Sequence, residues 1–318
     1  MNLLFVADPL ESFKTYKDTT FAMMREAQRR GHQIHACGPQ DLVWRSGGMV
    51  QAAVRPITLT GQPDAWFRED ATVQRALKDF DAVVMRKDPP FDSEYFYATH
   101  LLEQAEREGA RVFNRPAALR DHPEKLAIME FARFCSPTLV TRDAEAVRRF
   151  HAEHHDIILK PLDGMGGMGI FRVKADGLNL GAVIETLNRD GAQTLMVQRF
   201  VPEIAQGDKR VLVIGGVPVP YCLARIPQGG EVRGNLAAGG KGVAQPLSER
   251  DREIAEALGP TLAARGLLLV GLDVIGSCLT EVNVTSPTCF QEITDQTGCN
   301  VAALFVDALE AALQVPQQ

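Results

Sequence analysis

The sequence is poor in the features that mark membrane, secreted and nucleic-acid-binding proteins. No stretch approaches the roughly 20 consecutive apolar residues of a membrane-spanning helix, and the first eight residues lack the basic segment that opens a signal peptide. Positive charge is not in excess: 34 Lys and Arg stand against 40 Asp and Glu, which argues against nucleic acid or an anionic membrane as the main partner. The six cysteines are scattered without a C-x-x-C pair and are expected to be free thiols of a reducing compartment. We therefore expect a cytoplasmic enzyme.

What is present is an ordinary globular composition over a long chain. Of the 318 residues, 45% are hydrophobic and 23% are charged, so the chain can bury a sizeable core in two or three domains. Changes of pattern place the domain boundaries near residues 122 and 200. We expect domains over residues 1–122, 123–200 and 201–318.

The first domain alternates strand and helix patterns. Residues 2–7 form a short continuous apolar run, which is typical of a strand buried on both faces. A helix follows over 19–30, with Asp18 as its N-cap and Gly31 as its stop. Later segments repeat the alternation, with strands at 32–36, 81–86 and 111–114 and a helix at 93–108. This order predicts an α/β fold with a parallel sheet.

The rest of the chain mixes both element types. Helices are predicted at 123–134, 143–154, 179–189, 248–265 and 300–313. Strands are predicted at 156–159, 170–173, 194–200, 210–214 and 217–225, and a hairpin is predicted over 268–284.

A glycine-rich segment, 160–169, is the first stretch that suggests chemistry. Gly164, Gly166 and Gly169 satisfy G-x-G-x-x-G, but the dinucleotide fingerprint requires a helix after the loop. Residues 170–173 alternate apolar and polar side chains as a strand does, and no Gly-Lys-Ser/Thr follows, so neither a Rossmann nor a Walker A loop fits. A strand–loop–strand hairpin remains, whose backbone N–H groups could cover phosphates while Lys160 projects toward them. The alternative is a solvated turn.

The hairpin over 268–284 suggests a metal site, and its register decides the chemistry. A two-residue turn would put Asp273 and Glu281 on opposite faces of the sheet. A three-residue turn over 276–278 pairs them and places Asn283 on their face, with the apolar residues on the other, which burial favours. Three oxygen-bearing side chains on one face suit Mg²⁺ held together with nucleotide phosphates. The alternative is a solvated polar face.

Three further features have a functional and a simpler interpretation. Arg86 ends a predicted parallel strand, where open α/β sheets bind ligands. His151, His154 and His155 would share a helix face, but no acidic or cysteine ligand stands at zinc spacing, so solvated surface is favoured. The glycine-rich stretch Ile226–Lys241 around Arg233 predicts a loop that is mobile without ligands and closes over bound substrates. The alternative is a permanently solvated loop.

Several long segments resemble the ATP-grasp ligases, and among them the bacterial-type glutathione synthetases. The resemblance covers nearly the whole chain and is carried by residues 86–92, 158–167, 208–213, 220–230, 233–240 and 280–288. It implies an ATP-grasp fold with an N-terminal Rossmann-like domain, a central lid domain and a C-terminal catalytic domain. ATP would lie between the last two. Lys241 stands where the family is associated with arginine, and the positive charge is kept.

The resemblance also implies roles for individual residues. ATP phosphates would be held by Lys125 and Lys160 and covered by Gly164, Met165, Gly166 and Gly167. Adenine would be read by the backbone of Gln198, Arg199, Phe200 and Val201, and the ribose by Asp208. The metal, Mg²⁺ with Mn²⁺ as an alternative, would be held by Asp273, Glu281 and Asn283. The peptide substrate would face Asp18, Arg86, Arg210, Asn283, Ser286, Pro287 and Thr288. Charge on the transferring phosphoryl group would be stabilised by Arg210, Arg225 and Arg233.

The reaction implied is the ATP-dependent ligation of γ-glutamylcysteine to glycine through an acyl phosphate, in a homotetramer. The nearest alternative assignments are other ATP-grasp ligases, of the D-alanine–D-alanine or glutamate type, which lack the sequence motif at residues 86–92. A catalytically inactive nucleotide-binding regulator is the rival of another class. It would be expected to lose Lys160, Asp273 or Glu281, and all three are present.

Overall fold

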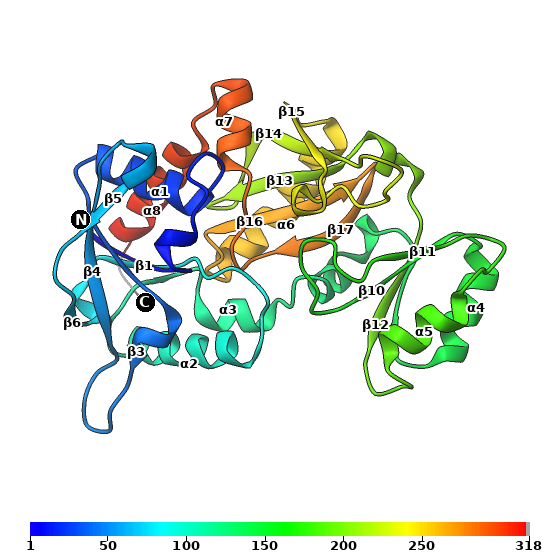
Figure 1. Cartoon of the computed structure of the whole chain (residues 1–318), viewed down its shortest axis with the longest axis horizontal. Helices are drawn as coiled ribbons and strands as arrows, with labels where there is room; N and C mark the ends of the chain where they lie inside the picture. The colour runs from blue at the N-terminus through cyan, green and yellow to red at the C-terminus, as the bar shows by residue number, and fades with distance from the viewer. Residues whose placement is uncertain (316–318) are drawn as a thin grey trace.

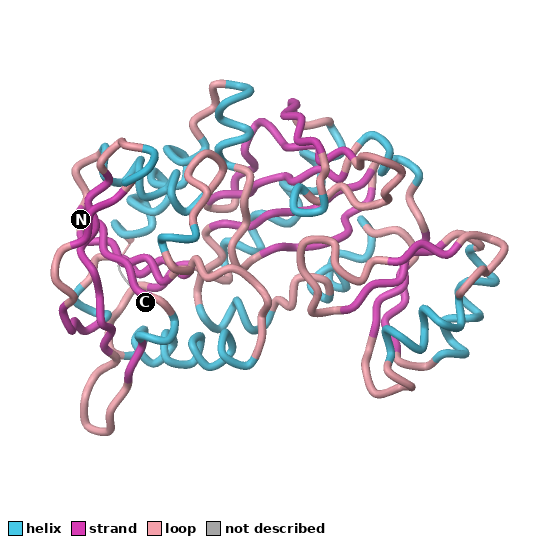
Figure 2. Tube along the Cα trace, in the orientation of Figure 1, coloured by secondary structure: helices cyan, strands magenta, loops and turns pink. Residues whose placement is uncertain are grey.

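The computed structural model describes residues 1–315, which form three sheets flanked by helices (Figures 1 and 2). Each sheet comes from one continuous stretch of chain: residues 2–113, 138–199 and 208–283. Within residues 1–315, none of the helices combines the length and apolar character that a membrane crossing needs.

The strands of the first sheet are β1 (Asn2–Val6), β2 (Gln33–Cys37), β3 (Leu42–Val43), β4 (Gln51–Leu59), β5 (Phe67–Glu69), β6 (Val73–Ala76), β7 (Ala82–Met85) and β8 (Val112–Phe113). Those of the second are β9 (Thr138–Thr141), β10 (Ile157–Pro161), β11 (Phe171–Val173) and β12 (Leu195–Arg199). Those of the third are β13 (Asp208–Ile214), β14 (Val217–Ile226), β15 (Lys241–Pro246), β16 (Leu269–Ile275) and β17 (Cys278–Asn283).

The α-helices are α1 (Thr19–Arg29), α2 (Ser93–Arg107), α3 (Pro116–Asp121), α4 (Ala144–His154), α5 (Leu180–Asn188), α6 (Glu249–Ala264), α7 (Phe290–Thr297) and α8 (Val301–Gln314). The 3₁₀ helices are η1 (Leu10–Ser12), η2 (Pro39–Asp41), η3 (Pro63–Ala65), η4 (Leu77–Asp79), η5 (Leu126–Phe134), η6 (Pro202–Gln206) and η7 (Leu236–Ala238).

The predicted parallel core of the first sheet is confirmed. β1 pairs in parallel with β2 and β7, and β7 pairs in parallel with β8. Alternate residues of β1 enter opposite cores: Leu4 and Val6 pack on the α2 side, while Leu3 and Phe5 pack on the side of α1 and α8. Burial on both faces explains why this strand is a continuous apolar run.

The sequence interpretation missed the antiparallel part of the first sheet. β4 pairs antiparallel with β2, β3, β5 and β6. Pro56 lies within β4 and removes one backbone N–H donor from that strand. The strands that pair with β4 are short. A proline inside a weakly alternating run argues against a strand until its partners are known.

A second prediction was wrong in detail: residues 123–134 do not form a regular helix. η5 spans Leu126–Phe134 as a 3₁₀ helix, and its backbone leaves helical geometry at Phe131, with φ −115° and ψ 32°. The segment contacts β17 of the third sheet. Its apolar side chains Ile128 and Phe134 are buried in the core that the third sheet shares, so tertiary packing overrides the regular helix that the local pattern predicts.

The second sheet is antiparallel, in the order β11-β10-β12-β9, and α4 and α5 pack on it at one end of the molecule (Figure 1). The predicted strand–loop–strand around the glycine segment is confirmed, because β10 pairs directly with β11. α4 ends at His154, and His155 has a positive φ of 64°. His155 therefore does not continue the helix face of His151 and His154.

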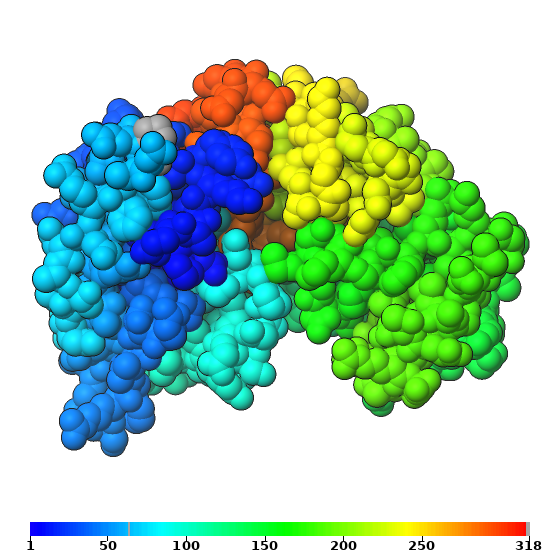
Figure 3. Space-filling model, in the orientation of Figure 1, coloured from blue at the N-terminus to red at the C-terminus, as the bar shows by residue number. Residues whose placement is uncertain are grey.

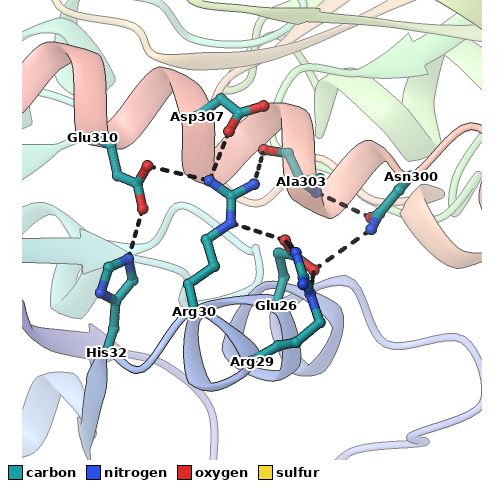
Figure 4. Close-up of polar contacts among 8 residues, drawn as sticks. All are labelled: Glu26, Arg29, Arg30, His32, Asn300, Ala303, Asp307 and Glu310. Atoms are coloured by element: carbon teal, nitrogen blue, oxygen red, sulfur yellow. Dashed lines mark hydrogen bonds and ion pairs between the residues drawn. The ribbon is translucent and has the colours of Figure 1, made fainter.

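The third sheet is antiparallel as well, in the order β15-β14-β13-β16-β17. α6 packs on one face of it, while α7 and α8 pack on the other and also against the first sheet. Polar contacts reinforce the α1–α8 contact: Arg30 binds Glu26, Asp307 and Glu310, and His32 binds Glu310 (Figure 4). The end of the chain thus joins the first sheet to the third.

Candidate active site

The candidate site is a cleft of about 480 Å³ that is lined by residues within or next to all three sheets. Figure 3 shows the opening between the dark-blue N-terminal segment, the green stretch around the glycine segment and the yellow stretch near residues 226–241. Every residue assigned to the site from the sequence borders it. The tertiary structure therefore gathers residues that are up to 270 positions apart, from Asp18 to Thr288.

The β16–β17 hairpin confirms the predicted pairing and corrects the predicted turn. Asp273 lies opposite Glu281 and Gly271 lies opposite Asn283, so Asp273, Glu281 and Asn283 share one face as expected. The turn has two residues, not three, because Ile275 pairs with Cys278. A register shift between Asp273 and Val274 restores the pairing: the bulge adds on β17 the residue that the shorter turn omits.

Four buried charges surround the cleft face of β13, β14 and β16. Arg210 donates to both oxygens of Asp273, at 2.6 and 3.1 Å. Arg225 lies 2.9 Å from Asp273 and 2.5 Å from Asp208. Burial alone would raise the pKa of Asp273, but the charges of Arg210 and Arg225 hold it below its usual value. Asp273 is therefore an anion at neutral pH.

Asp208 is in the opposite situation. Burial raises its pKa to about 6, against the opposing charge of Arg225. Its Oδ2 accepts from Arg225, while its buried Oδ1 has no partner within residues 1–315. Burying an oxygen without a hydrogen-bond donor lowers the stability of the fold. A ligand that donates a hydrogen bond to this atom would remove that cost.

Two lysines lie beside the glycine segment. Lys125 Nζ donates to Gly164 O at 2.5 Å and lies 3.1 Å from Glu281 Oε1. Lys160 Nζ donates to Thr280 O at 3.3 Å, and burial lowers its pKa, partly offset by Glu281. A cation that is buried with so few anionic partners favours an anionic ligand.

The glycine segment meets the loop that follows β14. A Cβ at Gly167, whose φ is 84°, would lie 2.7 Å from Asn235 Oδ1, so this position requires glycine. Arg233 donates to Gly167 O at 3.4 Å and to both oxygens of Glu231. The two loops therefore touch across the cleft, one from each of the last two sheets.

The first sheet contributes residues at the carboxyl end of β7 and the start of α1. Arg86 is buried and donates to Thr20 Oγ1 and to Pro287 O, both at 3.1 Å. Burial lowers its pKa. Asp18 is the predicted N-cap of α1, because its Oδ1 accepts from Phe21 N–H at 2.7 Å. Burial raises the pKa of Asp18.

The segment after β12 has fewer free groups than the resemblance implied. The N–H of Arg199 donates to Pro137 O and that of Phe200 donates to Asp156 O. The side chain of Gln198 donates to Thr138 Oγ1. These two N–H groups are therefore already paired within the protein.

Three acidic residues of the cleft escaped the sequence interpretation: Asp88, Glu124 and Glu292. Asp88 lies inside a segment that carried the resemblance and accepts from Ser286 Oγ at 2.6 Å. Glu124 directly precedes Lys125, so its position was a usable signal. Glu292 follows the Asn283–Thr288 segment, and no sequence pattern marks it.

The oxygen-bearing side chains fit a divalent cation by their chemistry. Within residues 1–315, no group of three or more His, Cys, Asp or Glu side chains is arranged as a metal site. The set here consists of two carboxylates and a carboxamide. Asn283 Nδ2 donates to Gly271 O at 3.1 Å, which leaves Oδ1 to bind a cation. Hard oxygen donors of this kind suit a cation that is shared with phosphates.

Comparison with known proteins places this site in a family. The model for the N-terminal domain of prokaryotic glutathione synthetase matches residues 1–120, and the model for its ATP-grasp domain matches residues 124–298. The chain is 63% identical to a glutathione synthetase of Ralstonia nicotianae, over 98% of this chain and 96% of that protein. It is 60% identical to one of Nitrosomonas europaea, over 98% of both chains.

Solved structures agree on the fold. The D-cycloserine synthetase DcsG superimposes with a TM-score of 0.68 at 16% identity, covering 98% of this chain and 99% of that one. The ATP-grasp ligase PsnB, in a complex with Mg and ADP, gives a TM-score of 0.64 at 20% identity, over 98% and 97% of the two chains. At such identities they show the ATP-grasp fold alone. With the family models and close relatives over nearly its full length, the chain belongs to the prokaryotic glutathione synthetases, a family of ATP-dependent, ADP-forming ligases.

Proposed function

We propose that this cleft joins γ-glutamylcysteine to glycine with the residues named above in specific roles. The overall reaction is ATP + γ-glutamylcysteine + glycine → ADP + phosphate + glutathione. The observation that carries the assignment is the register of β16 and β17, which puts Asp273, Glu281 and Asn283 on one face. That face borders the same cleft as both glycine-rich loops.

The phosphates of ATP would be held from two sides. Lys125 and Lys160 are the buried ammonium groups nearest the glycine segment, and the backbone N–H groups of 164–167 would cover the phosphates. Asp208 Oδ1 is an acceptor of the kind that a ribose hydroxyl would satisfy. The backbone of 198–201 would contact the adenine.

The metal would be Mg²⁺, with Mn²⁺ as an alternative, held by Asp273, Glu281 and Asn283. When bound, it would neutralise phosphate charge and orient the phosphates. ATP-grasp ligases in general use ATP with a divalent metal, and Mg is named for PsnB.

The reaction needs no protein nucleophile, because the cysteinyl carboxylate is already ionised at neutral pH. This carboxylate would attack the γ-phosphorus and release ADP, and the glycine amine would then attack the acyl carbon and release phosphate. Arg210, Arg225 and Arg233 would stabilise the charge on the transferring phosphoryl group. Asp18, Arg86, Arg210, Asn283, Ser286, Pro287 and Thr288 would hold the peptide substrate.

The loop Ile226–Lys241 would act as a lid. Its contact with Gly167 through Arg233 and Asn235 spans the cleft, and a closed lid would protect the acyl phosphate from water. Trypsin should cut after Arg233 rapidly in the free protein and much more slowly with ATP, Mg²⁺ and γ-glutamylcysteine together. Equal cleavage in both conditions would exclude the lid.

One experiment tests the reaction itself. ADP and glutathione are measured with ATP, MgCl₂, γ-glutamylcysteine and glycine, each omitted in turn, and with D-alanine in place of both amino-acid substrates. ADP should form one-for-one with glutathione and only in the complete mixture. Turnover with D-alanine but not with the dipeptide would refute the substrate assignment.

We also propose a homotetramer, by resemblance, and a cytoplasmic location, which the six free cysteines of the chain support. The mass of the native protein, measured by light scattering against the 34.8 kDa of one chain, tests the first.

A further inference from the structure

Glu124, at the start of the second predicted domain, is hydrogen-bonded to the strand that carries two of the proposed metal ligands and to the residues that follow it. Its Oε1 accepts three hydrogen bonds: from Val284 N–H at 3.0 Å, Thr285 N–H at 3.1 Å and Thr285 Oγ1 at 2.8 Å. Its main-chain carbonyl accepts from Val282 N–H at 3.0 Å. Glu124 therefore holds three of the four positions 282–285 at the end of β17, and the fourth is Asn283, which borders the cleft.

These partners alternate with the residues of the proposed chemistry. Val282 lies between Glu281 and Asn283, while Val284 and Thr285 lie between Asn283 and Ser286. Next along the chain, Lys125 reaches Glu281 Oε1 and Gly164 O. Residues 124 and 125 thus link the glycine segment, the metal face and the start of the substrate-binding segment.

Opposing effects act on the carboxyl group of Glu124. Burial raises the pKa of its carboxyl and the charge of Glu281 adds to this, while the hydroxyl of Thr285 and the two amides oppose both. Hydrogen bonds to a charged acceptor are stronger than those between neutral groups. The three donors that converge on one of its oxygens offset the cost of partly burying this carboxylate.

We propose that Glu124 is a positioning residue of the ligation: it fixes β17 and its exit relative to Lys125, so that the phosphates and the acyl group are aligned when glycine attacks. This inference rests on the proposed roles of Lys125, Glu281 and Asn283. A loosened site still forms the acyl phosphate but leaves it open to water. Hydrolysis then returns γ-glutamylcysteine and phosphate, so that ATP and water give ADP and phosphate without glutathione.

The test is Glu124→Gln, which keeps the size of the side chain and one acceptor oxygen but removes the charge. We expect kcat for glutathione to fall by about 10- to 100-fold, the KM for ATP to change less than about threefold, and the ratio of ADP to glutathione to rise above one. Thr285→Val, which removes the hydroxyl donor, should show the same changes to a smaller degree. Thr285→Ser should restore most of what the valine variant loses. Glu185→Gln, an exposed carboxylate on α5, is the matched control.

The two readouts separate positioning from stability. The inference is wrong, and the carboxylate only stabilises the fold, if three results occur together. Glu124→Gln loses activity only in step with a lower melting temperature and still forms one ADP per glutathione. Thr285→Val and Thr285→Ser behave alike. If the parent protein makes no glutathione, the proposed function fails, and this inference fails with it. A working parent beside a fully coupled, fully active Glu124→Gln overturns this inference alone.

Discussion

Two networks of arginines and carboxylates in this molecule use the same chemistry in different surroundings. In the cleft, the side chains of Arg210, Arg225, Asp273 and Asp208 are between 3% and 12% exposed. Between α1 and α8, Arg30 is 17% exposed but its partners Glu310 and Asp307 are 32% and 62% exposed (Figure 4). The network in the cleft has little contact with water, whereas the network between α1 and α8 remains partly exposed to water.

The two networks also differ in how completely they are satisfied. Both oxygens of Glu26 accept hydrogen bonds, from Arg29, Arg30 and Asn300. In the cleft, Asp208 Oδ1 has no partner in the described part of the chain. Buried ion pairs cost desolvation that their attraction repays only with complete hydrogen bonding. The incomplete network is the one in the active site, where a ligand can complete it, and the complete one holds two helices together.

The largest effect should come from breaking the cleft network. Asp273→Asn removes the anion that binds both Arg210 and Arg225, so we expect kcat to fall about 1000-fold and the free energy of unfolding to fall by about 3 kcal/mol, because two buried guanidinium groups lose a partner. Rates of ADP release and urea unfolding measure the two effects.

Glu281→Gln is the matched variant, because it removes a proposed metal ligand and leaves the four-charge network intact. It should lower turnover by about 100-fold and raise the Mg²⁺ concentration needed for half-maximal rate, with a nearly unchanged unfolding curve. If Asp273→Asn stayed within tenfold of the parent rate, the network would not be part of the catalytic machinery.

A smaller effect is expected at the α1–α8 interface, and on stability alone. Arg30→Ala loses bonds to Glu26, Asp307, Glu310 and the carbonyl of Ala303, so the free energy of unfolding should fall by about 2 kcal/mol while kcat stays within twofold. Arg29→Ala is the control, since Arg29 is 67% exposed and, among residues 1–315, its side chain pairs with Glu26 only. Its melting temperature should fall less than that of Arg30→Ala, because most of the Arg29–Glu26 attraction is screened by water. A loss of activity in Arg30→Ala without a loss of stability would remove the distinction between the networks.

The smallest effect concerns acid. The hydrogen bonds from Arg29 and Arg30 lower the pKa of Glu26 to about 2. Because this folded-state pKa lies below the unfolded one, the stabilisation is complete above about pH 4.5 and is lost as pH falls toward 2. The difference in unfolding free energy between the parent and Glu26→Gln should shrink by about 1 kcal/mol between pH 5 and pH 3. A constant difference over this range would show that Glu26 is not ionically coupled to the arginines.

The local sequence predicted the structure correctly where the side-chain pattern of one element, or a single capping residue, determines it. The two-sided run of β1, the cap at Asp18 and the strand after the glycine segment each depend on neighbours in sequence, and each is confirmed. The turn of the β16–β17 hairpin was predicted one residue too long. The apolar pattern specifies which side chains share a face, and a bulge satisfies it as well as a longer turn does.

Other features had no local signal. The strands between residues 42 and 76 pair around a β4 that contains Pro56, and η5 is irregular because it packs on a distant sheet. Glu292 looks like a surface acid until the fold partly buries it beside the cleft. Burial of a charge depends on which elements surround it, and that information is distributed over the whole chain.

By itself, the sequence determined the alternation of elements, the glycine-rich loops and the spacing of oxygen-bearing residues on β16 and β17, because these follow from side-chain periodicity and backbone freedom. Only the tertiary structure decided that Arg210 and Arg225 share Asp273, that Lys125 meets Glu281, and that Glu124 holds Thr285. The reason is physical: each of these contacts joins residues that are at least 48 positions apart, and its strength depends on the water that the folded domains exclude.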